Sequence, residues 1–135
     1  MLLLCQGQEM LLSMQEKKYC YKPIHLKLSL NILKKNLKQI TSAQDWARYM
    51  GYSRSYFSTC FSEHFGETPY QCLCRVRYGQ LHKVILQYPY KTSRAIAAEI
   101  GLKDEQALYK FLNRHYETNF TEIREKLLYD KEYNN

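Results

Sequence analysis

One pattern of apolar residues and turn glycines occurs twice in this chain. The dipeptide Trp46-Ala47, followed by Gly51, corresponds to Ile96-Ala97 followed by Gly101, 50 residues later. An apolar triplet spaced four residues apart recurs 51 residues later: Phe57, Phe61 and Phe65, then Leu108, Leu112 and Tyr116. Each copy therefore predicts two amphipathic helices joined by a tight turn. The expected fold is all-α, with two helix-turn-helix (homeodomain-like) subdomains.

A long linking helix is predicted between the two copies. The segment Thr68-Pro69-Tyr70-Gln71 combines a capping Thr, a Pro in the first turn and a Gln at the third position. This helix is expected to end at Gln87, before Pro89, with a length of roughly 28 Å at about 1.5 Å per residue.

About seven helices are expected in five parts of the chain. Residues 1–22 form an N-terminal leader or linker, 23–68 the first helix-turn-helix module, 69–88 the linking helix, 89–128 the second module and 129–135 a polar tail that frays. The first helix begins after Pro23 and carries an apolar stripe, made of Leu26, Leu30, Leu33, Leu37 and Ile40. The other predicted N-caps are Ser42, Ser53, Thr68, Thr92 or Ser93, Asp104 and Asn119.

The charge is positive and unevenly distributed. The chain carries 20 Lys and Arg against 13 Asp and Glu, a net charge of +7. Residues 1–60 hold 9 basic and 3 acidic groups, and residues 61–135 hold 11 and 10. A polyanionic partner is therefore expected, with most of the electrostatic attraction in the first half.

The sequence carries no signal for a metal, a cofactor, a small-molecule site or a membrane span. Its five cysteines lack CxxC spacing, which predicts buried, reduced thiols. Its histidines lack ligand spacing, and its apolar runs are too short to cross a bilayer. No catalytic constellation is present either, so an enzyme is not expected.

The two copies resemble the AraC/XylS family of bacterial transcription regulators. The first reads GYSRSYFSTCFSEHFGETPYQCLCRVR and the second RAIAAEIGLKDEQALYKFLNRHYETNFTEIRE, within a resemblance that covers roughly residues 26–128. It implies a cytoplasmic protein that binds double-stranded DNA, each module placing its second helix in a major groove. RNA polymerase is a further candidate partner. The sequence departs from the family pattern at Leu81, Leu102, Glu117 and Phe120.

Helical spacing and the resemblance together predict the DNA contacts. One face of the second helix carries Ser55, Thr59 and Ser62, and the equivalent face 51 residues later carries Gln106, Lys110 and Asn113. The predicted base contacts are Arg54, Ser55, Ser58, Thr59, Glu105, Gln106 and Lys110. The predicted phosphate contacts are Arg48, Ser62, Arg75, Arg77, Lys103 and Asn113. For Arg77, a structural salt bridge between the linking helix and a module is an equal alternative.

Sequence-specific regulation of transcription is thus the first functional hypothesis. The alternative is a protein-interaction or anti-regulator module that keeps the fold without specific DNA binding. Glu105, Glu117 and the nearly neutral second half favour that alternative.

Overall fold

The computed structural model describes residues 23–134, which are helical and contain no strand. The prediction of an all-α fold is confirmed. The described helices are α2 (Pro23–Lys35), α3 (Ala43–Met50), α4 (Arg54–Phe65), α5 (Pro69–Gln87), α6 (Ser93–Glu99), α7 (Glu105–Tyr116) and α8 (Phe120–Tyr133). The prediction made for residues 1–22 lies outside the described part of the chain.

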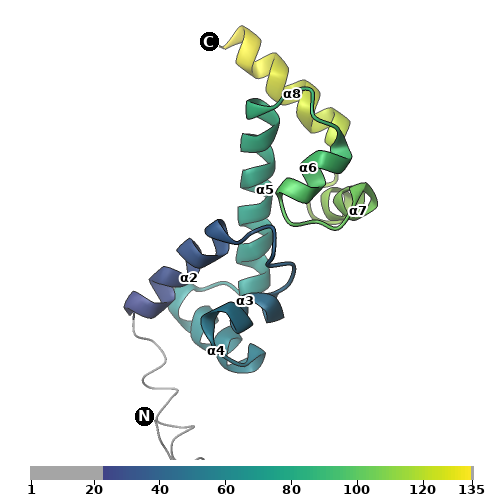
Figure 1. The fold of residues 1–135 in the computed structure, drawn as a ribbon. Helices are drawn as coiled ribbons and strands as arrows, with labels where there is room; N and C mark the ends of the chain where they lie inside the picture. Colours follow the sequence, from purple (N-terminus) through teal and green to yellow (C-terminus); the bar gives the residue numbers. More distant parts are fainter. Residues whose placement is uncertain (1–22, 135) are drawn as a thin grey trace, which may run out of the picture.

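The long helix α5 runs through the molecule and carries a group of helices at each end (Figure 1). Helices α2, α3 and α4 pack around its first half, and α6, α7 and α8 around its second half. The first group encloses a core that includes Trp46, Phe57 and Phe61. The second encloses a separate core that includes Ile96 and Leu112. The repeated sequence pattern therefore corresponds to two modules, each with its own buried core.

Local hydrogen bonds explain where the helices begin. Six N-cap side chains each accept a bond from a backbone N–H in the first helical turn: Ser42, Ser53, Thr68, Thr92, Asp104 and Asn119. Thr68 and Gln71 form the reciprocal capping box. Asp45 is the third residue of α3, but it does not complete such a box with the N-cap Ser42. Its carboxylate instead accepts hydrogen bonds from the hydroxyl (2.6 Å) and the N–H (3.1 Å) of Thr41. These hydrogen bonds from Thr41 lower the pKa of Asp45.

The structure corrects the expected helix ends. Helix α2 stops at Lys35. Leu37 and Ile40, the last two residues of its predicted stripe, lie in the segment that follows the helix, and both are still buried in the core. At the other end, residues 129–133, which are predicted to be a fraying tail, continue α8. The rings of Tyr129 and Tyr133 lie one turn apart with their centroids 4.6 Å from each other, and this i, i+4 pair supports the last turn.

The thiols differ from one another. Cys72 and Cys74 are free and buried, as expected. Burial raises the pKa of Cys72 to about 11, so its thiol is protonated and inert at neutral pH. Cys60 is disulfide-bonded, which corrects the expectation of a reduced thiol at that residue.

The second module keeps the backbone of the first where its residues depart from the family pattern. Gly66 ends α4 with φ 75°, and Glu117 ends α7 with φ 49°, both in the left-handed region. Pro69 opens α5, and Phe120 opens α8 at the corresponding place. The chain therefore adopts the same turn in both modules, although a left-handed conformation costs Glu117 more than a glycine.

Between residues 23 and 134, none of the helices is both long and apolar enough to cross a membrane.

Candidate nucleic-acid interface

Helix α4 presents a polar outer face because its other side is in the core. Phe57 and Phe61 are fully buried against Trp46 in edge-to-face ring contacts. This packing turns the opposite side of the helix outward, and the predicted contacts lie there. Arg54, Ser55 and Thr59 are exposed, while Ser58 and Ser62 are half-buried.

Helix α7 presents the equivalent face in the second module. Leu108 and Leu112 are buried, and Gln106, Lys110 and Asn113 are exposed. Lys103, Gln106 and Lys110 line one hollow of about 170 Å³. The structure therefore brings these three predicted DNA contacts onto a single surface.

Glu105 is held away from that hollow. Its Oε2 accepts a hydrogen bond of 2.7 Å from the hydroxyl of Ser93, the first residue of α6. Glu105 and Gln106 line a second hollow of about 390 Å³ together with Tyr109, which is 58% exposed. The contact between Ser93 and Glu105 could not be predicted from the sequence, because it spans 12 residues and follows no helical period.

Two of the predicted phosphate contacts already have acidic neighbours. Arg48 lies 3.3 Å from Asp45, and Arg75 pairs with Glu67, which raises the pKa of Arg75. Both arginine side chains are well exposed. Exposed ion pairs of this kind contribute about 0–1 kcal/mol, so both cations can turn to a phosphate at little cost. Lys103 and Asn113 are also exposed.

Arg77 is the exception among the predicted phosphate contacts. Its side chain is only 4% exposed, and its guanidinium donates to two backbone carbonyls: Nε to Ile100 (2.9 Å) and Nη2 to Ile40 (3.1 Å). It also lies over the ring of Phe111 at 5.9 Å. Arg77 is therefore buried and joins the linking helix to both modules, as the structural alternative expects, but its partners are backbone carbonyls rather than a carboxylate.

The comparison with protein families gave a match to this chain. A model described as "Helix-turn-helix domain" matches residues 46–126, which is more than half of the chain. The match begins in α3 and ends in α8, so it takes in α4, the linking helix α5, α6 and α7, and leaves out α2. The chain belongs to this AraC-type helix-turn-helix family. Comparisons with curated proteins and with solved structures gave no match.

Membership in the family sets the general class of the protein. AraC-type helix-turn-helix domains are DNA-binding regulators and do not form an enzyme family. In residues 23–134 of this helix-turn-helix protein, no three His, Cys, Asp or Glu side chains gather where they could hold a metal ion. DNA is therefore the partner that the family indicates.

Proposed function

We propose that this protein recognises a specific sequence in double-stranded DNA by placing α4 and α7 in successive major grooves, and that it regulates bacterial transcription from the cytoplasm. One observation carries the proposal. Both helices expose a polar face at equivalent positions, and each is held in place by a core of its own. A helix-turn-helix reads base edges with such a face of its second helix.

The chemistry of the two faces gives them different tasks. In α7, Gln106 fits adenine through a bidentate pair, and Lys110 can donate to the acceptors of guanine. In α4, Ser55 and Thr59 can each donate to or accept from several bases, so discrimination there is weaker. We assign attraction to the phosphates mainly to the basic first module and base selection mainly to the second.

A protein-interaction or anti-regulator module is the second candidate function. It is favoured by the carboxylate of Glu105, which is exposed on the outer surface of α7. A carboxylate at this position repels phosphate and accepts only from a donor such as the amino group of cytosine.

Site selection from a random pool of duplexes, followed by salt titration on the selected site, separates the two functions. A regulator that uses both modules selects a site covering two grooves, and its affinity falls steeply as salt rises, because cations are released from the phosphates. Failure to enrich any sequence, with no binding at low salt, would refute DNA recognition and favour the interaction module.

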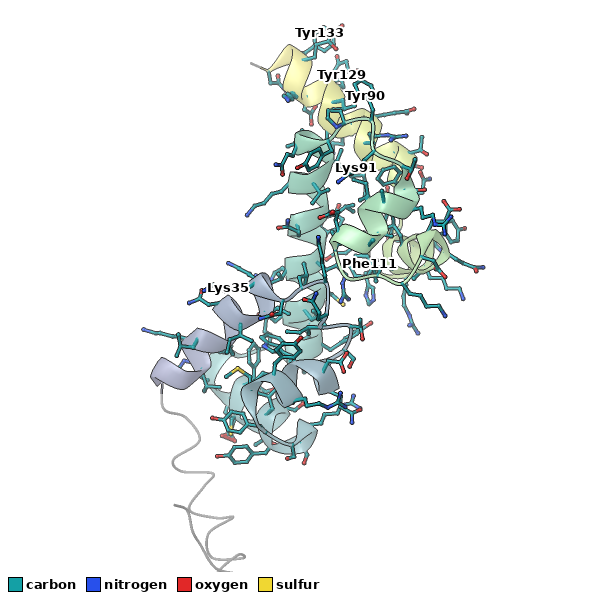
Figure 2. All side chains as sticks on the ribbon, in the orientation of Figure 1. Lys35, Tyr90, Lys91, Phe111, Tyr129 and Tyr133 are labelled. Atoms are coloured by element: carbon teal, nitrogen blue, oxygen red, sulfur yellow. The ribbon has the colours of Figure 1, made fainter. Side chains whose placement is uncertain are left out.

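A pair of charge reversals controls for overall charge. Lys110→Glu removes a proposed base contact, whereas Lys35→Glu makes the same change in charge on α2, on the other side of α5 from α7 (Figure 2). We expect Lys110→Glu to abolish the preference for the selected site over random DNA and Lys35→Glu to preserve it. Equal loss of preference in both variants would contradict the assignment of Lys110.

A further inference from the structure

Arg77 binds one carbonyl from each module. Ile100 is the C-cap of α6 in the second module, and Ile40 ends the turn that leads into α3 of the first. We propose that Arg77 is a positioning residue that locks the two modules into one rigid unit, so that the protein accepts only one spacing between its two half-sites. This inference rests on the proposed function, since spacing has meaning only if both modules bind DNA.

The guanidinium is suited to this task by its shape. It is a planar fork whose donors point in fixed directions, and here two of them bridge two separate backbone segments. Without it, both carbonyls lose a donor in the interior, where an unsatisfied polar group is costly. A lysine ammonium is a compact point charge on a flexible stem, so it does not fix the directions of hydrogen bonds to two separate carbonyls.

The backbone around Arg77 shows that the modules are in close contact. A Cβ placed on Gly101, in the turn of the second module, would lie 2.2 Å from the carbonyl oxygen of Leu37 in the first. It would also lie 3.6 Å from Nη2 of Arg77. Nearby, Glu99 lies 3.2 Å from Lys38 and 3.6 Å from Lys91. Arg77 therefore lies at the contact between the two modules, so a rotation of one module against the other would have to break its hydrogen bonds.

A rigid pair of modules has a direct consequence on DNA. One inserted base pair moves a half-site by about 3.4 Å and turns it by about 35° around the duplex axis. Modules locked together cannot follow that displacement, so one of them loses its contacts. Modules that can move relative to each other can follow the shifted half-site, so both keep their contacts with the DNA.

The DNA test measures affinity for the selected site and for the same site with one base pair inserted between its halves. The natural protein and the control Lys83→Met, which changes an exposed cation on α5, should lose at least about tenfold in affinity on the insertion. Arg77→Met should lose less than about threefold, because its modules adjust. An equal loss in Arg77→Met and the control would overturn the proposal, as would tolerance of the insertion by the natural protein.

A second test needs no DNA and so separates this proposal from the proposed function. Spin labels are introduced through genetically encoded, non-cysteine side chains at Gln44 in α3 and Lys126 in α8, both exposed. The distribution of distances should be narrow in the natural protein and in Lys83→Met, and broad in Arg77→Met. Identical distributions would overturn the proposal even if the protein binds DNA. If the natural protein binds no DNA, a broadened distribution still supports the lock while the proposed function fails.

A second variant keeps the test decisive if Arg77→Met fails to fold. Arg77→Lys keeps the charge and most of the volume, so both modules should stay helical in circular dichroism. We expect its distance distribution to be broader than that of the natural protein, because one ammonium does not replace the fork. A distribution as narrow as the natural one would show that charge alone suffices and would overturn the role given to the bridging geometry.

Discussion

Gly101→Ala and Gly51→Ala make the same change at equivalent turns that differ in their surroundings. Both glycines have left-handed backbones, with φ 83° and φ 80°, so alanine is strained by a similar amount at each. A Cβ at Gly51 would meet nothing within 4 Å, whereas a Cβ at Gly101 would lie 2.2 Å from the carbonyl oxygen of Leu37. The pair therefore isolates the contact between the modules from the strain of the turn.

The structure gives a magnitude for each change. The left-handed conformation costs alanine about 1–2 kcal/mol, which is the whole expected loss for Gly51→Ala. At Gly101 a carbon–oxygen contact of ordinary length needs about 1 Å more than is available, and overpacking of this kind costs a further 1–3 kcal/mol or so. We therefore expect Gly101→Ala to lower the free energy of unfolding by about 2–5 kcal/mol.

Urea unfolding measures both losses with two signals. Circular dichroism follows all helices, and the fluorescence of Trp46, which is the single tryptophan and lies in the first core, follows the first module. In Gly101→Ala the transition followed by circular dichroism should separate from the one followed by fluorescence, because the two modules lose their close contact and no longer unfold together. Equal losses of stability in the two variants, with coincident transitions, would refute the close contact between the modules.

Three further outcomes are expected. Lys110→Ala should reduce the preference for one base pair of the selected site by about 1–3 kcal/mol, measured by competition between duplexes that differ at that position. Glu117→Gly should raise the free energy of unfolding in urea by about 1 kcal/mol, because glycine adopts φ 49° without strain. The hydrogen bond from Lys38 lowers the pKa of Glu99, so this pair stabilises the fold at neutral pH, and the stabilisation is lost in the acidic range as the pH falls through that lowered pKa. Glu99→Gln should accordingly lose less stability than the natural protein over that range in urea unfolding at fixed pH.

The outcomes that would contradict these predictions are distinct. A uniform loss on every duplex would show that Lys110 contacts phosphate. Lower stability of Glu117→Gly would mean that the Glu117 side chain makes a contact worth more than its backbone strain. Parallel pH curves for the natural protein and Glu99→Gln would remove the ion pair with Lys38 from the account of stability.

The helices could be predicted from the sequence because local chemistry decides where they begin. Residues such as Ser42 and Asp104 bind an N–H three positions along the chain, so the pattern in the sequence is also the pattern of the hydrogen bonds. The exposed face of α7 could also be predicted from the sequence. Once Leu108 and Leu112 are buried, the helical period puts Gln106 and Lys110 on the outside.

The contacts between modules could not be predicted, because they join residues that are distant in the sequence. Arg77 bonds to carbonyls 37 and 23 residues away, and backbone carbonyls carry no sequence signal. The close approach of Gly101 to Leu37 is hidden for another reason. The left-handed turn already requires a glycine at position 101. The close approach to Leu37 requires a glycine as well, so it adds no further signal to the sequence. Helix α8 extends through residues 129–133, where the polar sequence has no apolar stripe from which a helix could be predicted.

Footprinting of the selected duplex with hydroxyl radicals tests the central claim most directly, because it shows where each module meets the DNA backbone. Two modules reading successive major grooves from one face should protect two patches whose centres lie about 10–10.5 base pairs apart. A single protected patch, or two patches at another separation, would contradict the account.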